Sequence, residues 1–273
     1  MFRRLVVLLA ALGALAGAPS ALAAFPAPLA TQGGSGLPSL DGSLRFVATK
    51  AGTDTVVSAI RASGGATVME QTVPGAYGVP TITQSGLTAG LFHDGSALVL
   101  QNVGIEKTSS FVILDAQDLA MRDTITLKGT FGFDALSPDS SKLYLIQRTS
   151  TQDVQHYVVR AYDLSTHTLL PGRVADKTQK DWLMQGWAVS RVTTADGRWA
   201  YTLYANPGGY PFIHALDTVN AVAHCVGLPW KAADQNPVWS FTLALKGKSL
   251  AVKRQDGRTW RLVNRTSWRV STT

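Results

Sequence analysis

The feature that most constrains the fold is a hairpin pattern that occurs five times along the chain. In each copy an apolar run leads into a tight turn, and a second alternating apolar run follows, as in FDALSPDSSKLYLIQ (133–147). Asp-Gly between two such runs is a strong hairpin signal because the turn needs a positive φ. The copies are 45 to 57 residues apart, their turns lying at Asp41, Asp94, Asp139, Asp196 and Lys246. A repeat of this period predicts one structural unit stacked several times.

Two further strands follow each hairpin. The third strands are TVVSAIR (55–61), FVILD (111–115), YVVRAYD (157–163), FIHALD (212–217) and TWRLVN (259–264). The weaker fourth strands are ATVMEQTVP, DTITLKG, HTLLPGRV, AVAHCVGL and SWRVSTT. Repeats of four antiparallel strands predict an all-β chain, a single β-propeller of about five four-stranded blades. A sixth, degenerate blade hidden in the long spacings is one alternative, and a β-sandwich or stacked meander is another. KTQKDWLMQG (177–186) is the longest non-strand piece, where we expect one short turn of helix.

The first two dozen residues have the composition of a secretory signal. A basic start precedes the apolar run LVVLLAALGALAGA, and Ala21-Leu22-Ala23 places small residues where a signal peptidase cleaves. The run is short for a membrane anchor, which needs about 20 apolar residues. We therefore expect a signal peptide over 1–24, a lead over 25–32 and a propeller domain over 33–273. This predicts a secreted or extracytoplasmic protein of the bacterial cell envelope, with no transmembrane segment in the mature chain.

Composition and charge narrow the class of protein. The apolar content of 45% and the charged content of 16% are ordinary for a globular protein. The single cysteine, Cys225, excludes an intrachain disulfide. The formal net charge of +7 is local, because residues 246–273 hold eight Lys and Arg against Asp256 alone. The rest of the mature chain is slightly acidic.

One of the repeats carries a family resemblance. LSPDSSKLYLI followed by YVVRAYDLST resembles the YVTN/WD40-like and TolB-like bacterial propeller repeats, which read Ser-Pro-Asp-Gly, then an apolar strand, then a strand ending in Asp-Leu. TADGRWAYTLY with FIHALDT is a fair match, and the outer blades match in pattern only. The resemblance implies the fold and leaves the function open, since propellers support many activities.

Inner strands of propeller blades line a central channel, so we compared the positions five residues before each turn. These positions hold Gly36, Ala89, Asp134, Arg191 and Phe241. Asp134 and Arg191 fall at the same depth on neighbouring blades, which predicts an ion pair across the channel wall. The pair would either polarise a ligand at the channel mouth or keep a narrow channel ordered.

No set of residues typical of catalysis or metal binding stands out. The GxSxG and HExxH motifs are absent, and His224-Cys225 is the one neighbouring His/Cys pair. Adjacent strand residues point to opposite faces, so we expect one of the two to be in the core. Turn chemistry explains the aspartates of the repeat without calcium. We therefore predict no catalytic residue, no metal and no cofactor.

Two surface features are candidate binding sites. TLYANPGGYPFIH (202–214) places Tyr204 and Tyr210 beside a loop, where aromatic rings either stack on a sugar or peptide or pack a blade edge. The basic last blade would bind an anionic polymer or deter strand aggregation. Its candidate residues are Lys253, Arg254, Arg258 and Arg261.

The sequence therefore predicts an exported, monomeric, non-catalytic propeller that acts as a binding or scaffold module. Its expected partner is an unknown protein or an anionic cell-envelope polymer contacted through the C-terminal blade. Nucleic acid is not an expected partner of an exported protein. The alternative is a secreted hydrolase or lactonase-type enzyme with its polar site at the channel mouth. In that case Asp134, Arg191 and His93 would be the groups to test.

Overall fold

The computed structural model describes residues 30–104, 106–149, 156–178, 183–206, 209–230 and 236–272. Across these ranges the chain is all-β, with one short 3-10 helix, η1 (Asn236–Ser240). The described part holds no helix long and apolar enough to cross a membrane. The predicted signal peptide, residues 1–24, lies outside the described residues.

The strands form five antiparallel sheets, one for each predicted unit, which confirms the five blades. Blade 1 contains β2 (Leu37–Pro38), β3 (Leu44–Ala51), β4 (Asp54–Arg61) and β5 (Thr67–Val73). Blade 2 contains β1 (Ala30–Thr31), β6 (Tyr77–Pro80), β7 (Ala97–Asn102), β8 (Thr108–Asp115) and β9 (Met121–Lys128). Blade 3 contains β10 (Phe131–Leu136), β11 (Lys142–Arg148), β12 (His156–Asp163), β13 (Thr168–Leu169) and β14 (Met184–Gln185). Blade 4 contains β15 (Trp187–Thr193), β16 (Trp199–Ala205), β17 (Phe212–Asp217) and β18 (Val222–Gly227). Blade 5 contains β19 (Thr242–Lys246), β20 (Ser249–Lys253), β21 (Thr259–Asn264) and β22 (Val270–Thr272).

Each hairpin turn has the positive φ that the sequence pattern demands. Gly occupies that place in four copies, and Ser140 occupies it in blade 3 with a φ of 56°. The turn aspartates are held by local hydrogen bonds. The Oδ1 atom of Asp139 accepts one from the Ser137 hydroxyl at 2.6 Å and one from the Ser141 N–H at 3.1 Å. The aspartates therefore build the turns, as predicted.

The inner side of blade 2 departs from the repeat. The segment before its turn makes only isolated bridges, such as Leu91 to Leu98, and β6 pairs with β7 over Tyr77 and Gly78. The short strand β1 then pairs with β6 on its other side. A side chain at Gly78 would lie 2.7 Å from the Thr31 carbonyl oxygen, so β1 needs a glycine there to approach. Residues 30–31, which we assigned to a lead before the propeller, are therefore part of a blade.

The expected helical turn over 177–186 is not present in the described part of that segment. Met184–Gln185 is the strand β14, which pairs with His156 and Tyr157, the first two residues of β12. The Met184 side chain is buried in the core between blades 3 and 4. Burial of that side chain and pairing with the free edge of β12 favour an extended backbone over a helical turn. Residues 179–182 lie outside the described residues.

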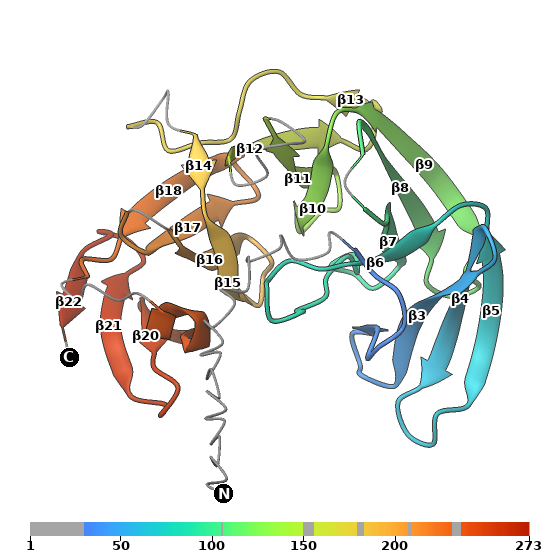
Figure 1. The fold of residues 1–273 in the computed structure, drawn as a ribbon, viewed down its shortest axis with the longest axis horizontal. Coiled ribbons are helices and arrows are strands. Elements are labelled where there is room, and N and C mark those ends of the chain that lie inside the picture. Colours follow the sequence, from blue (N-terminus) through green and yellow to red (C-terminus); the bar gives the residue numbers. More distant parts are fainter. Residues whose placement is uncertain are drawn as a thin grey trace, which may run out of the picture.

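Four hydrophobic cores hold the blades together, and each is shared by two consecutive blades. They join blades 1 and 2, 2 and 3, 3 and 4, and 4 and 5. Within the described ranges no such core joins blade 5 to blade 1. Figure 1 shows the same arrangement, with the five sheets as an arc around a centre and blades 1 and 5 at its two ends. The stability of the chain therefore depends on four nearest-neighbour interfaces.

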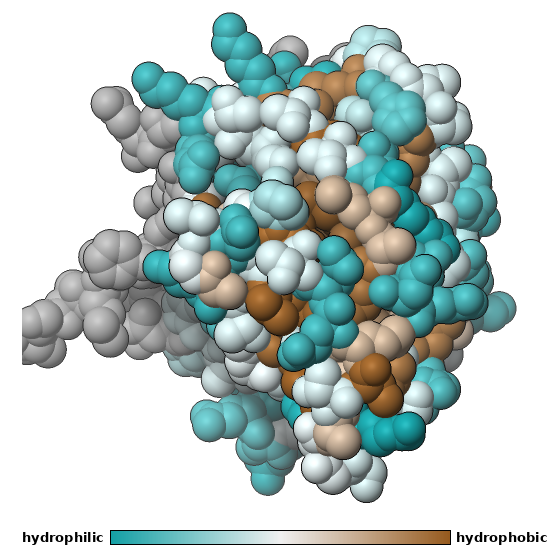
Figure 2. Space-filling model, turned by 90° about the vertical axis from the view of Figure 1, so that its right-hand side faces the viewer, coloured by the Kyte–Doolittle hydropathy of each residue, from teal (hydrophilic) through white to brown (hydrophobic). Residues whose placement is uncertain are grey.

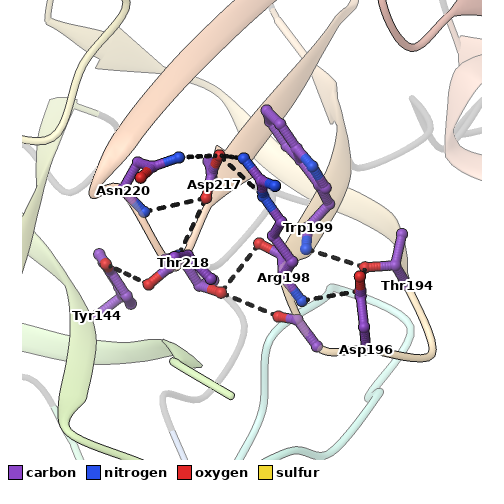
Figure 3. A network of polar contacts seen from close by, with 10 residues as sticks. Tyr144, Thr194, Asp196, Arg198, Trp199, Asp217, Thr218 and Asn220 are labelled. Atoms are coloured by element: carbon purple, nitrogen blue, oxygen red, sulfur yellow. Dashed lines mark hydrogen bonds and ion pairs between the residues drawn. The ribbon is translucent and has the colours of Figure 1, made fainter. Parts of the chain in front are cut away.

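A polar network fixes blade 4 against blade 3 (Figure 3). The buried Tyr144 of β11 donates a hydrogen bond of 2.8 Å to the main-chain carbonyl of Thr218, just after β17. The neighbouring Asp217 carboxylate accepts hydrogen bonds from the Arg198 guanidinium and from Asn220. Burial raises the pKa of Asp217, but these hydrogen bonds outweigh burial and hold it below its usual value. The hydrogen bond of Tyr144 therefore ties β11 of blade 3 to the end of β17 in blade 4.

The outer side of blades 1 and 2 is mostly hydrophilic. Figure 2 shows this side of the molecule, with hydrophobic residues in a broken band among hydrophilic ones. Val68 of β5 and Met121 of β9 are among the exposed apolar side chains, at 42% and 52% exposure. Single exposed apolar residues of this kind are normal on a protein surface.

Candidate functional site

Asp134 of β10 and Arg191 of β15 form a direct ion pair between blades 3 and 4. The side chains are 3% and 4% exposed, so both charges are buried. The Arg191 guanidinium donates to Oδ1 and to the main-chain carbonyl of Asp134, and its Nε donates to the Thr202 hydroxyl at 2.8 Å. The two residues that the turn alignment placed at one depth are therefore in contact. The second carboxylate oxygen of Asp134, Oδ2, is buried and has no partner among the described residues.

A row of polar side chains continues from Arg191 outward across blade 4. The strand register places Thr202, His214 and Cys225 side by side on β16, β17 and β18. The His214 Nδ1 atom lies 3.6 Å from the Cys225 sulfur. Burial lowers the pKa of His214 to about 4 and raises the pKa of the Cys225 thiol to about 12. The row is therefore neutral at physiological pH apart from the ion pair.

A pocket of about 80 Å³ lies against the Asp134 carboxylate on the inner side of blades 2, 3 and 4. We call it the Arg148 pocket. Its polar lining includes Thr81, Thr83 and Gln84 from blade 2, with Asp134, Arg148, Tyr157 and Tyr204. Its apolar walls are Ile82, Phe133, Ile146 and Trp187. Gly186 completes the wall, and a side chain there would lie 2.2 Å from the Ala205 carbonyl oxygen.

Two polar groups of this pocket lack partners in the described part of the chain. The Nε and Nη1 atoms of Arg148 are buried and unbonded, and so is the Tyr157 hydroxyl. Burial lowers the pKa of the Arg148 guanidinium and raises the pKa of Tyr157 well above its usual value. Tyr157 is therefore a hydroxyl donor at neutral pH. An arginine still carries its charge in such a place, so the pocket contains an unneutralised cation.

A second cavity, of about 150 Å³, lies on another side of the ion pair. His93, Asp134 and Arg191 all line it, together with Thr193 and Thr218. The three groups that we named for a channel-mouth enzyme therefore share one cavity. One oxygen of the Asp134 carboxylate is engaged by Arg191 in this arrangement.

The structure separates the two tyrosines of the blade 4 loop. Tyr204 is 4% exposed, lines the Arg148 pocket and stacks on Phe212 with ring centroids 5.0 Å apart. Tyr210 is 58% exposed and lines neither cavity. Tyr204, which the sequence places beside a loop, is therefore buried against the Arg148 pocket.

The basic residues of blade 5 lie at two ends of the sheet. Lys253, Arg254 and Arg258 flank the β20–β21 turn. Lys246, Lys248 and Arg269 lie in the β19–β20 and β21–β22 turns, at the opposite end of the same antiparallel strands. Each end therefore carries its own group of cations.

Arg261 differs from its neighbours because it is held by the blade itself. Its guanidinium carbon lies 4.3 Å from the centre of the Trp260 ring, and its Nη1 donates to the Trp260 carbonyl at 2.9 Å. Such stacking fixes the side chain against the sheet. Arg261 therefore projects less freely than the other predicted cations.

An open groove adjoins the β20–β21 turn. It is lined by Pro237, Ser240, Phe241, Arg254, Gln255 and Asp256. Trp239 of η1 is 39% exposed nearby in sequence. On this turn Arg258 and Asp256 form an ion pair at 3.8 Å, with both side chains exposed. We find no group of three or more His, Cys, Asp or Glu side chains placed to hold a metal within the described ranges.

No family model matches the chain, and no curated protein matches it. Several solved structures are similar to the chain. TolB from Acinetobacter baumannii is similar at 13% identity and a TM-score of 0.44, over 84% of this chain and 53% of that one. A putative TolB from Agrobacterium tumefaciens is similar at 12% identity and a TM-score of 0.44, over 86% and 78%. The Myceliophteria thermophila Cps50 (Swd1) β-propeller domain is similar at 11% identity and a TM-score of 0.48, over 89% and 72%.

The fold is a β-propeller of five blades. This assignment rests on the strand order, in which each blade is an antiparallel sheet that runs from the centre outward. The chain spans about half the length of the Acinetobacter protein. At such low identity the similarity is one of fold alone.

Proposed function

We propose that this propeller is a non-catalytic binding module that contacts an acidic polysaccharide of the cell envelope through the β20–β21 end of blade 5. The observation that carries the proposal is the combination of cations at that end with one exposed aromatic side chain, Trp239, close to it in sequence. Arg254 lines an open groove with Phe241, and the exposed Trp239 lies in the adjoining helix η1. Sugar rings stack on aromatic side chains, and arginine binds carboxylates through planar paired donors.

The charge balance of the groove supports an anionic partner. Lys253, Arg254 and Arg258 face a single carboxylate, Asp256, across the turn. The Arg258–Asp256 contact at 3.8 Å is long and exposed, so it neutralises little of this charge. The potential at this end of the blade is therefore positive and would attract a polyanion.

Export belongs to the same proposal. The basic, apolar and small-residue segments of residues 1–24 are the sequence observation that supports it. Expression of the full chain in a bacterial host, with mass spectrometry of the recovered protein, tests it. A mature N-terminus near residue 24 or 25 is the expected result, and an uncleaved chain retained in the cytoplasm would contradict export.

Retention on an isolated cell-wall fraction and on an immobilised acidic polysaccharide tests the binding function. The variant Lys253→Gln/Arg254→Gln/Arg258→Gln should lose the retention that wild type shows at low salt. The matched variant Lys246→Gln/Lys248→Gln/Arg269→Gln removes three charges from the opposite end of the blade and should keep it. Equal loss of retention in both variants would mean that net charge alone causes retention, which contradicts a site at one end of the blade. Absence of retention by wild type at any salt would overturn the proposal.

A hydrolase or lactonase-type enzyme is the second candidate, favoured by the cavity that His93, Asp134 and Arg191 share. Turnover of ester and lactone substrates by wild type, with loss in His93→Ala, would support it. Asp134 is engaged by Arg191 in a buried ion pair, so the binding module is the better supported of the two.

A further inference from the structure

The Arg148 pocket contains a cation whose charge nothing in the described structure balances. The one carboxylate that lines the pocket, Asp134, is already bound by Arg191. Two of the three guanidinium nitrogens of this half-buried side chain are buried without a hydrogen bond, and such desolvation is costly. Arg148 is therefore a candidate ligand-binding residue, on a different surface from the proposed polysaccharide site of blade 5.

We propose that the Arg148 pocket binds a carboxylate that carries a hydrogen-bond donor on the neighbouring carbon. Arg148 and the Tyr157 hydroxyl supply donors for the carboxylate, since both have buried, unbonded polar atoms in this pocket. Asp134 also lines this pocket, and we assign its unbonded Oδ2 atom as the acceptor for the second group. Two donors and one acceptor on one small pocket match α-hydroxy acids, α-amino acids and the C-terminal residue of a peptide.

The size and charge of the pocket favour a carboxylate over a phosphate or sulfate. A volume of about 80 Å³ holds a small group, and Ile82, Phe133, Ile146 and Trp187 offer apolar contact to a short aliphatic part. One unpaired arginine balances one negative charge. A phosphate at neutral pH carries up to about two negative charges, and the nearby Asp134 would repel the excess.

The geometry also predicts how the unliganded protein responds to substitution. Arg148→Met removes an unpaired buried charge, and Tyr157→Phe removes an unbonded buried hydroxyl. Arg148→Met breaks no hydrogen bond between described residues, so this variant should fold with a melting temperature at or above that of wild type, whereas Tyr157→Phe also loses the interaction with Tyr204. A purely structural role for Arg148 would lower the melting temperature of Arg148→Met instead.

The test is calorimetric titration of the purified protein with lactate, propionate, N-acetylalanine, N-acetylalanine amide and sulfate. Lactate or N-acetylalanine should bind, and propionate should bind at least about tenfold more weakly because it offers Asp134 no donor. Arg148→Met and Tyr157→Phe should each weaken binding, the former by about tenfold or more. Arg45→Met is the matched control, because Arg45 also has a buried, unbonded Nε but lies in blade 1.

Binding of lactate alone would identify free small acids as the source of the ligand. Binding of N-acetylalanine but not of its amide would identify chain ends, and either result supports the carboxylate site. The proposal is overturned if none of the carboxylates binds, if propionate or sulfate binds as tightly as lactate, or if Arg148→Met binds like wild type.

Discussion

Asp134 of blade 3 and Arg191 of blade 4 are joined by a buried ion pair that uses one carboxylate oxygen of Asp134 and leaves the other unbonded. The pair therefore has two consequences. It joins the two inner strands at the centre of the propeller, and it leaves an unbonded acceptor atom on a residue that lines the Arg148 pocket. The first consequence concerns stability, and the second concerns the ligand.

Removing Asp134 should destabilise the protein strongly. Asp134→Ala leaves the Arg191 guanidinium buried without its counter-charge, and loss of one partner of such a pair costs about 3 to 5 kcal/mol. The free energy of unfolding from urea denaturation is the measurement. Asp134→Ala/Arg191→Met, which removes both charges, should recover most of the loss. A cost below about 1 kcal/mol for the single variant would mean that the pair is not buried as described.

Tyr144→Phe should loosen the interface between blades 3 and 4. The variant loses the hydrogen bond to the Thr218 carbonyl and leaves that acceptor buried, at a cost of about 1 to 3 kcal/mol. Tyr210→Phe changes a tyrosine that is 58% exposed and serves as the control. Equal denaturation midpoints for the two variants would contradict the role of the network in Figure 3.

The five blades can be predicted from the sequence because each turn is specified by residues that are neighbours in the chain. The Arg148 pocket cannot, because residues of three blades line it. Asp139 and Ser140 specify their turn through local hydrogen bonds and a positive φ, so neighbours in sequence carry the signal. The contact between Asp134 and Arg191 could be predicted because both residues lie five positions before the turn of their blade, and so at the same depth in the channel. β1 carries no repeat signal, and its place in blade 2 depends on Gly78, almost fifty residues away.

Arg148 escaped prediction for a related reason. It is the last residue of β11, where a basic side chain next to a loop normally faces solvent. It shares its pocket with Tyr157 and Tyr204, which come from other strands. The comparison of positions before each turn, which predicts the contact of Asp134 with Arg191, covers the inner strands alone. Arg148 lies on β11, so a prediction of its place would need the same comparison for the second strand of each blade.

His214 should make the protein sensitive to mild acid. Its folded-state pKa of about 4 lies below the ordinary value of 6.5, because burial disfavours the charged ring; Asp134 opposes this shift, and Arg191 adds to it. As the pH falls from 6.5 to 4 the unfolded chain takes up the proton first, so stability declines by about 3 kcal/mol. Above pH 6.5 the group has no effect. His214→Leu should flatten this decline in urea denaturation, while His167→Gln, at an exposed site, should keep it.

A second loss of stability should follow at lower pH. Hydrogen bonds from Ser137 and Ser141 lower the pKa of Asp139 from 3.8 to about 2. A depressed carboxylate stabilises the fold above pH 3.8, and that contribution disappears as the pH falls toward 2. Ser137→Ala removes the largest cause and should reduce the pH dependence in this window. Identical denaturation profiles for wild type and Ser137→Ala between these pH values would contradict the assignment.

The β20–β21 end of blade 5 is proposed to bind an acidic polysaccharide. Calorimetric titration with a galacturonic acid oligomer measures that binding. Wild type should bind at about 50 mM salt and lose most of its affinity at about 200 mM, as charge-driven binding does. Lys253→Gln/Arg254→Gln/Arg258→Gln should abolish binding at the lower salt, and Lys246→Gln/Lys248→Gln/Arg269→Gln should leave the affinity near that of wild type. Equal affinities for the two variants, or no binding by wild type, would contradict the account.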